Sequence, residues 1–390
     1  MKCLAQLEDE PVQCVATSPP YWGLRDYGTN GQIGLESTPD EYISKMVQVF
    51  REVKRVLRRD GTLWLNIGDS YANSTPGSGG KCVLVGSGRA MTDARYHDIK
   101  RDVSSLKPKD LCGIPWMLAF ALRADGWYLR QDIIWAKPNP MPESVTDRCT
   151  KSHEYIFLLT KSERYFYDAE AIKEKAIEGA DLGLLRGRIP EASGHVAWHT
   201  QSILNRQESG VDSRTAGNGT RNKRSVWNVA TFPFPEAHFA TFPPALIEPC
   251  ILAGTSEKGC CAKCGAPWER ITESETRFES GSGKAGNPPQ GKNGSDYEQA
   301  LSGDYDIRMG PVKQTRTVGW QPTCKCGTAD IKPCTVLDPF SGSGTTGLVA
   351  LRYHRNFIGI ELNPEYAAMG QRRIVNDAPM FNKLELSEQS

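Results

Sequence analysis

The chain has 390 residues, of which 39% are hydrophobic and 24% charged, and its formal net charge is +1. This composition is typical of a globular protein with a sizeable apolar core. The near-zero charge excludes nucleic-acid binding through overall charge, so any basic binding surface has to be local. Residues 1–6 lack the apolar core of a signal peptide, and no apolar run approaches the roughly 20 residues that span a bilayer. The sequence therefore predicts a cytoplasmic protein that makes no membrane contact.

In the first half of the chain, short apolar runs alternate with stretches in which apolar residues recur at helical spacing. Residues 12–17 form a predicted buried strand. Thr38 suits the cap of the helix that follows, Pro39 suits its first position, and Glu41 completes a capping box. Apolar residues then recur at helical spacing, and Gly61 ends this pattern. Further along, the sequence predicts strands over 62–67, 127–135 and 153–159 and a helix over 111–123.

Regular structure returns near the C-terminus. A strand, a turn and a helix are expected over 335–350, a strand over 357–362, and a helix from Pro364 onward. Strands that alternate with helices are typical of an α/β fold with a mostly parallel sheet and helices on both faces.

A glycine-rich turn, Asp-Pro-Phe-Ser-Gly-Ser-Gly-Thr, joins the strand and the helix within 335–350. Glycines let the backbone approach a ligand and aim N–H groups at it. A phosphate-binding loop would need Gly-Lys-Ser/Thr, which is absent, and a dinucleotide site would keep three spaced glycines. S-adenosylmethionine has no phosphate, and its cationic amine and sulfonium suit Asp338 at the strand end.

Glu361 ends the next strand, roughly twenty residues later, where an acceptor for ribose hydroxyls is expected. Together the two segments predict a cofactor site. The candidate cofactor-binding residues are Asp338, Pro339, Phe340, Ser341, Gly342, Ser343, Gly344, Thr345, Glu361 and Asn363.

Ser18-Pro19-Pro20-Tyr21 follows the first predicted strand. An exocyclic base amine is a poor nucleophile because its lone pair is conjugated into the ring. The Ser18 hydroxyl and the Pro19 carbonyl can accept hydrogen bonds from the two N–H groups, which pyramidalises the nitrogen, and the adjacent prolines fix the turn. Tyr21 offers a face for stacking a base that has been flipped out of a duplex. Alone, the tetrapeptide would be a rigid turn beside a core tyrosine; the cofactor turn favours a catalytic role for Ser18, Pro19, Pro20 and Tyr21.

Residues 184–224 combine basic, polar and aromatic side chains, a mixture suited to phosphates and base edges. The alternative is a solvated insertion without a binding role. The candidate DNA-binding residues are Arg186, Arg188, Arg206, Arg214, Arg221, Lys223 and Arg224.

Two close cysteine pairs, each followed by glycine, form a zinc-ribbon pattern. In a cytoplasmic protein such pairs are more typical of metal binding than of disulfides. Four thiolates satisfy tetrahedral zinc, so we expect a structural site without an open position for catalysis. The expected ligands are Cys261, Cys264, Cys324 and Cys326, with Cys260 as an alternative to Cys261, and unpaired thiols are the alternative to a metal site.

Together these motifs resemble the amino-methylating DNA methyltransferases, which modify cytosine N4 or adenine N6. The catalytic motif of that family is Asp/Ser/Asn-Pro-Pro-Tyr/Phe, and its cofactor motif contains Asp-Pro-Phe-x-Gly-Ser-Gly-Thr. The order here, catalytic motif first and cofactor motif last, resembles the permuted subgroup called the beta class. Segments 65–70, 127–139, 225–227 and 238–243 add to the resemblance, which covers most of 10–255 and 333–375.

The resemblance implies a Rossmann-like S-adenosylmethionine-dependent methyltransferase fold with an inserted DNA-recognition region and a small zinc-ribbon-like insertion. The expected parts are a catalytic half (1–144), a DNA target-recognition region (145–224), a cofactor-binding half (225–254 and 333–378) and the ribbon-like insertion (255–332).

The resemblance also implies direct methyl transfer from the cofactor to the amine, with no covalent enzyme intermediate. Ser18 favours cytosine N4, because family members with Asp in that position often methylate adenine; adenine N6 is the alternative. A protein-glutamine or RNA amine methyltransferase is a more distant alternative, since the glutamine enzymes usually carry Asn there and lack the permuted order. A cytosine-C5 enzyme would use a Pro-Cys nucleophile, but the Pro-Cys dipeptides at 249–250 and 333–334 do not adjoin the catalytic strand.

The resemblance implies double-stranded DNA as the partner. It leaves open whether the protein forms a homodimer and whether a cognate restriction endonuclease exists. Family members usually begin with a strand ending in Gly-Asp ahead of a Cys-Leu pair. Here only Met1-Lys2 precedes Cys3-Leu4, so an incomplete start with weaker cofactor binding is one expectation.

Overall fold

The computed structural model describes residues 2–23, 26, 28–72, 106–107, 109–175, 220–232, 241–278, 311–380 and 382–387. The chain divides into two compact units. The first comprises Met1–Ile172, Arg224–Glu269 and Gln321–Ser390, and the second comprises Lys173–Lys223 and Arg270–Trp320. The first unit holds the catalytic and cofactor motifs predicted from the sequence.

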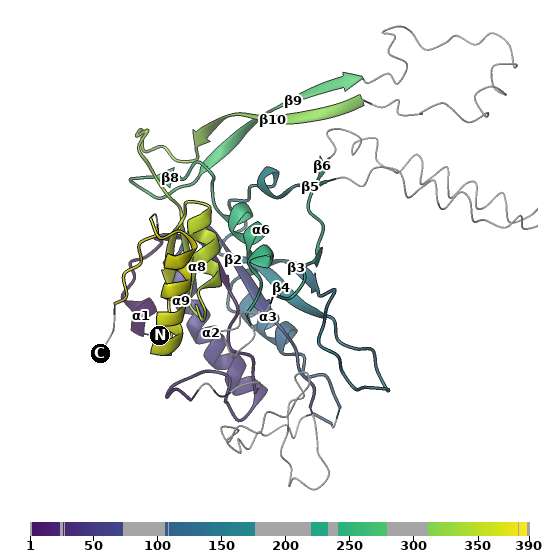
Figure 1. Ribbon diagram of the computed structural model, residues 1–390. Helices are drawn as coiled ribbons and strands as arrows, with labels where there is room; N and C mark the ends of the chain where they lie inside the picture. The colour runs from purple at the N-terminus through teal and green to yellow at the C-terminus, as the bar shows by residue number, and fades with distance from the viewer. Residues whose placement is uncertain are drawn as a thin grey trace, which may run out of the picture. The chain divides into compact units, whose positions relative to one another are not determined.

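A seven-stranded sheet forms the centre of the first unit, in the order β13-β12-β1-β2-β4-β3-β7. Figure 1 labels β2, β3 and β4 of this sheet. Strand β4 is antiparallel to both of its neighbours, and the remaining pairings are parallel. The predicted mostly parallel α/β sheet is therefore confirmed. The strands are β1 (Val12–Thr17), β2 (Leu57–Ile67), β3 (Tyr128–Ala136), β4 (His153–Thr160), β7 (Val226–Asn228), β12 (Thr335–Asp338) and β13 (Asn356–Gly359).

Helices cover both faces of this sheet. Because successive side chains of a strand point to opposite faces, Val15 and Leu63 join one apolar core, while Cys14 and Trp64 join the other. The first core includes residues of α1, α2 and α3, and the second includes residues of α6, α8 and α9. Every residue of β1 is consequently buried, as expected for a strand covered on both sides.

The described helices of this unit are α1 (Lys2–Ala5), α2 (Pro39–Val56), α3 (Ile114–Ala124), α6 (Pro244–Gly254), α8 (Thr345–Arg352), α9 (Pro364–Asp377) and the 3-10 turn η1 (Glu170–Ile172). Among the described residues, no helix is both long and apolar enough to cross a membrane.

The predicted start of α2 is confirmed, because the Thr38 hydroxyl accepts a hydrogen bond from the Glu41 N–H at 3.1 Å. Its predicted end is wrong. The helix stops at Val56, and Leu57 already pairs with Val12 as the first residue of β2. The register shifts by a bulge before the next pairing, so the stretch up to Gly61 belongs to the strand despite its helical spacing.

Strand β4 falls within one of the predicted parts of the chain. It lies within the 145–224 range expected for DNA recognition, yet its run of buried side chains places it between β2 and β3 in the main sheet. This part of the range therefore belongs to the main sheet, and the recognition region over the rest of the range stays a prediction.

Three two-stranded sheets complete the described structure. They pair β5 (Glu174–Lys175) with β6 (Thr220–Arg221), β8 (Cys260–Cys261) with β11 (Ile331–Lys332), and β9 (Trp268–Phe278) with β10 (Pro311–Pro322).

Candidate active site

The two predicted halves of the site meet where the neighbouring parallel strands β1 and β12 end. Thr17, the last residue of β1, donates a hydrogen bond of 2.6 Å from its hydroxyl to Asp338, the last residue of β12. The other carboxylate oxygen of Asp338 accepts from the Thr346 hydroxyl of α8 at 2.8 Å, and the Phe340 N–H donates to the first at 3.1 Å. Asp338 thus joins the strand before the catalytic motif to the cofactor turn and its helix.

Asp338 is 1% exposed. Burial raises the pKa of its carboxyl from 3.8 to about 6, although the hydrogen bonds from Thr17, Thr346 and Phe340 act in the opposite direction. The carboxylate that the sequence assigns to the cofactor also holds together the strands around it.

Glu361 plays a similar part for the glycine-rich turn. One of its carboxylate oxygens accepts from the Gly342 N–H at 2.7 Å, and the other accepts from the Asn363 N–H at 2.9 Å. Burial raises the pKa of Glu361, and these backbone donors oppose the rise. The Asn363 side chain in turn accepts from the Glu365 N–H and caps α9. The segments around Asp338 and Glu361, 23 residues apart, are therefore one assembly.

The turn needs glycine at its last position before α8. Gly344 has a φ of 73°, in the left-handed region, and a Cβ there would lie 2.9 Å from Ile374 Cδ1. The two hydroxyls that flank it, of Ser343 and Thr345, both accept from the Arg373 guanidinium, at 2.9 and 2.8 Å. Helix α9 thereby holds the glycine-rich turn in place through Arg373.

The catalytic motif follows β1, and Tyr42 of α2 anchors it by donating to the Pro20 carbonyl at 2.9 Å. The Tyr21 hydroxyl donates to the Glu154 carboxylate at 2.7 Å. Burial of the phenol, and next the negative charge of Glu154, raise the pKa of Tyr21 well above 10, while a hydrogen bond with Ser18 lowers it. Tyr21 therefore remains a neutral hydrogen-bond donor with a fixed ring.

Glu154 also binds other side chains beside Tyr21. The sequence did not single out Glu154 as a functional residue. Its carboxylate accepts from the Asn66 amide at 3.4 Å and forms an ion pair with Lys137. Glu154 lies near the start of β4, Asn66 near the end of the adjacent β2, and Lys137 just after β3. A charged residue at the start of an otherwise apolar strand was the one available signal in the sequence.

Asp69 is a second residue that the sequence reasoning did not single out. Its carboxylate accepts from the backbone N–H groups of Ser70, Gly113 and Ile114, which ties the loop after β2 to the start of α3. Lys151 donates to the Asp69 carbonyl at 2.6 Å. Burial raises the pKa of Asp69 and lowers that of Lys151.

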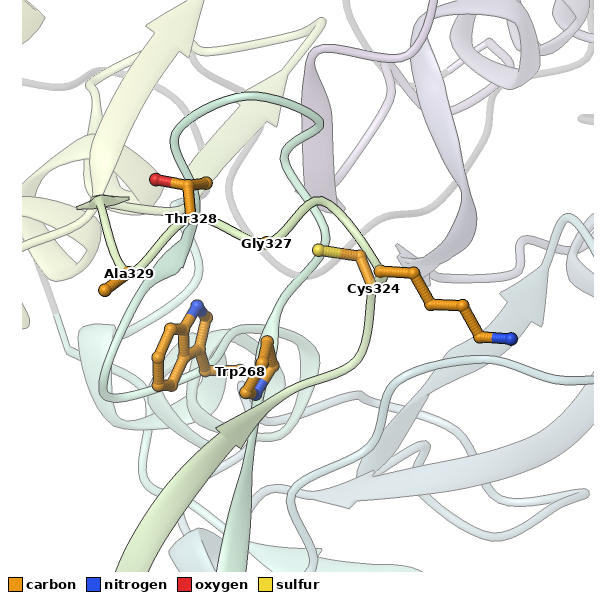
Figure 2. A pocket seen from close by; sticks show the side chains of 7 residues that line it. Trp268, Cys324, Gly327, Thr328 and Ala329 are labelled. Carbon is orange, nitrogen blue, oxygen red and sulfur yellow. The ribbon is translucent and has the colours of Figure 1, made fainter.

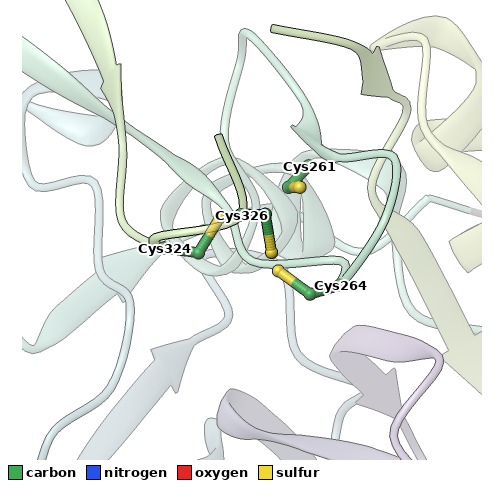
Figure 3. Close-up of side chains that lie close together, drawn as sticks. All are labelled: Cys261, Cys264, Cys324 and Cys326. Carbon is green, nitrogen blue, oxygen red and sulfur yellow. The ribbon is translucent and has the colours of Figure 1, made fainter. Parts of the chain in front are cut away.

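The four predicted metal ligands do converge. The Sγ atoms of Cys261, Cys264, Cys324 and Cys326 lie within 4.8 Å of one another (Figure 3). Cys260 is excluded as a substitute, since neighbouring residues of a strand point to opposite sides and its thiol faces the Lys332 and Pro333 carbonyls at 3.5 and 3.7 Å. This arrangement could hold a metal ion.

A cavity of about 470 Å³ lies beside this cluster (Figure 2). Its lining includes Trp268, Pro322, Cys324, Lys325 and Thr328. The catalytic and cofactor motifs do not line it, so it does not belong to the active site.

The candidate DNA contacts are only partly covered by the structure. Arg186, Arg188, Arg206 and Arg214 lie outside the described residues. Arg221 forms an ion pair of 2.9 Å with Glu174 across the β5–β6 pair, and the Arg224 carbonyl accepts from the Trp227 indole. Lys223 lies between them, just after β6.

Comparison with known proteins identifies the relatives of this chain. Residues 12–262 and 332–372 match a family model described as DNA methylase, N6_N4_Mtase. The Type II methyltransferase M.XycI of Xanthomonas campestris pv. cyanopsidis is 40% identical over 95% of this chain and 84% of its own length. The Type II methyltransferase M.Cfr9I of Citrobacter freundii is 39% identical over 96% and 85%.

Among solved structures, the cytosine-N4-specific PvuII DNA methyltransferase matches over 98% of this chain and 84% of that chain, with 16% identity and a TM-score of 0.44. The family match covers both motifs and most of the main sheet, and the two Type II methyltransferases match over nearly all of this chain. The chain therefore belongs to the amino-methylating N6/N4 DNA methylase family, and it is an S-adenosylmethionine-dependent DNA methyltransferase.

Proposed function

We propose that this enzyme transfers the methyl group of S-adenosylmethionine to the exocyclic N4 amine of cytosine in duplex DNA. The observation that carries the proposal is Ser18 in the first position of the catalytic motif, directly after the Thr17 that is bonded to Asp338. A serine is typical of the cytosine-N4 members of the family, and the bond fixes its strand against the cofactor turn.

The residues around the motif suit an amine that must become nucleophilic. The Ser18 hydroxyl and the Pro19 carbonyl would accept the two N–H groups of the amine. The Tyr21 ring would stack on a base flipped out of the duplex, and Glu154 holds that ring through the 2.7 Å bond to its hydroxyl. A fixed ring reduces the entropy that is lost when the base binds.

The turn of residues 338–345 and the acid Glu361 would hold the cofactor. Backbone N–H groups at the start of α8 and the nearby carboxylates Asp338 and Glu361 fit a ligand that carries a carboxylate, an amine and ribose hydroxyls. When bound, S-adenosylmethionine supplies an electrophilic methyl group on its sulfonium. The protein's part is to bring that methyl group and the amine into line, with no covalent bond to the enzyme.

Nucleoside mass spectrometry after methylation of duplex DNA tests the proposed position. We expect N4-methylcytosine as the product, with no label transferred to RNA or to protein from labelled cofactor. N6-methyladenine as the only modified nucleoside would assign the enzyme to adenine instead. Label confined to RNA or protein would reject DNA as the substrate.

We further propose that the basic residues within 184–224 contact DNA phosphates and base edges. The relatives are Type II methyltransferases, so we also propose a cognate restriction endonuclease as a partner and a cytoplasmic location for the enzyme. A homodimer, which the resemblance leaves open, is the assembly that we propose.

We also propose that the four-cysteine cluster binds one structural Zn²⁺. Four sulfur ligands in a closed set leave no open position, which suits a structural rather than a catalytic ion. Elemental analysis of the purified protein should find one zinc per chain, and Cys324→Ser should lose it. Cys149→Ser, which changes an exposed cysteine outside the cluster, should keep its zinc. Wild-type protein without stoichiometric zinc would refute the site.

A further inference from the structure

The buried side chain of Gln13 connects the four-cysteine cluster to the strands of the active site. Its amide nitrogen donates to the Gly265 carbonyl at 3.1 Å, and its amide oxygen accepts from the Thr335 N–H at 2.6 Å. Gln13 lies in β1, Thr335 begins β12, and Gly265 directly follows the ligand Cys264. One side chain therefore touches the cysteine loop, the catalytic strand and the cofactor strand.

The loop that carries Cys261 and Cys264 is fitted closely to this side chain. Gly265 has a φ of 70°, and a Cβ there would lie 3.1 Å from the Gln13 amide nitrogen. The Gly265 N–H bonds back to the Cys261 carbonyl at 2.8 Å. Arg58 of β2, itself paired with Asp60, donates to the Cys264 carbonyl. A shift of this loop would therefore disturb its hydrogen bonds to residues of both β1 and β2.

A second connection runs along the chain. Strand β8, which contains Cys261, pairs with β11, whose register is Ile331 with Cys261 and Lys332 with Cys260. Two residues, Pro333 and Cys334, separate the end of β11 from the start of β12. The position of the cysteine cluster thus fixes where the cofactor strand begins.

The β1–β12 pair is held by a side chain at each end. Gln13 bonds to Thr335 where the strands begin, and Thr17 bonds to Asp338 where they end. The register between them pairs Cys14 with Val336 and Val15 with Leu337. Ser18 and the cofactor turn follow directly, so their separation depends on this register.

We propose that metal binding at the four cysteines is coupled to cofactor binding through Gln13. This inference rests on the zinc and cofactor sites proposed above. A bound ion holds the Cys264–Gly265 loop in place, the loop holds the Gln13 amide, and the amide holds the start of β12 against β1. Without the ion, the loop moves and the Gln13 amide nitrogen loses its hydrogen bond to the Gly265 carbonyl. A buried polar group without a hydrogen-bond partner destabilises the folded state.

Coupling between two sites is reciprocal, so it can be measured from either side. We expect saturating cofactor to tighten zinc binding by about 10-fold, within the usual range of such couplings, as measured by equilibrium competition with a chromogenic chelator. Metal-stripped protein should bind S-adenosylmethionine about 10-fold more weakly by calorimetry. The chelator competition starts from the folded holoenzyme, and if the stripped protein unfolds, the Gln13→Met variant separates a path through Gln13 from stabilisation of the whole fold.

Gln13→Met separates the coupling from the metal site itself. The variant keeps all four cysteines and a side chain of similar length, and we expect it to bind zinc while the cofactor changes its zinc affinity much less than in wild type, because only the β8–β11 connection remains. Gln371→Met is the matched control, because the Gln371 amide also donates to a backbone carbonyl, that of Leu384, but it lies on α9 and not on the strands that Gln13 joins. The control should keep the wild-type response.

The outcomes separate the inference from the proposals beneath it. Absence of zinc, or absence of cofactor binding, would remove a proposed site and the coupling with it. Zinc and cofactor that both bind, with a zinc affinity that the cofactor does not alter, would overturn the coupling alone. A Gln13→Met protein that retains the full effect would show that the connection does not pass through Gln13.

Discussion

Replacing Ser18 with alanine is expected to lower kcat for methyl transfer by about 10²–10³-fold, the usual cost of removing one preorganised hydrogen-bonding group from a catalytic site. The reason is that the hydroxyl would accept an N–H of the amine as the nitrogen develops a lone pair. The dissociation constant of S-adenosylmethionine should not change, because the contacts of Asp338 and Glu361 do not involve Ser18. Single-turnover kinetics and calorimetry measure the two quantities separately.

Two further variants make this test specific. Ser37→Ala removes a hydroxyl just before α2, outside the site, and should keep wild-type kcat. Tyr21→Phe keeps a ring for stacking but loses the hydroxyl that donates to Glu154, so we expect a smaller loss of kcat than for Ser18→Ala. A Ser18→Ala enzyme with wild-type kcat would contradict the proposed role of the hydroxyl.

The parts of the site that follow from sequence are those with local signals. The turn of residues 338–345 is a contiguous run whose glycines and leading acid have a meaning of their own. The motif of residues 18–21 and the two cysteine pairs are equally local. Parallel strands that share an edge explain why the first two motifs meet.

Contacts between distant strands could not be read from the sequence. Glu154 reaches Tyr21 because β4 runs antiparallel beside β2, a pairing that no motif encodes. Asp338 was assigned to the cofactor by its charge, whereas its bonds to Thr17 and Thr346 depend on how β1, β12 and α8 pack. The end of α2 was misplaced for the same reason, since the pairing of Leu57 with Val12 overrides helical spacing.

The stability of the protein should depend on pH through Asp338. Folding raises the pKa of this carboxyl from 3.8 to about 6, so the folded state binds its proton more tightly than the unfolded chain does. The resulting stabilisation is complete below about pH 4 and is lost as pH rises through about 6. A shift of about two units corresponds to about 3 kcal/mol in the free energy of unfolding.

Asp338→Asn removes this titration. We expect the free energy of unfolding of wild type, relative to the variant, to fall by about 3 kcal/mol between pH 4 and pH 7 in urea denaturation. Asp377→Asn is the opposite control: the ion pair with Arg352 lowers the pKa of Asp377, so its contribution is present at neutral pH and is lost on acidification. Parallel pH profiles for wild type and Asp338→Asn would show that the buried carboxyl does not titrate in this range. If the free energy of unfolding of wild type relative to Asp338→Asn falls between pH 4 and pH 7, Asp338 loses its proton in this range and that loss opposes folding. Binding of a cationic cofactor beside the carboxylate would then offset that cost.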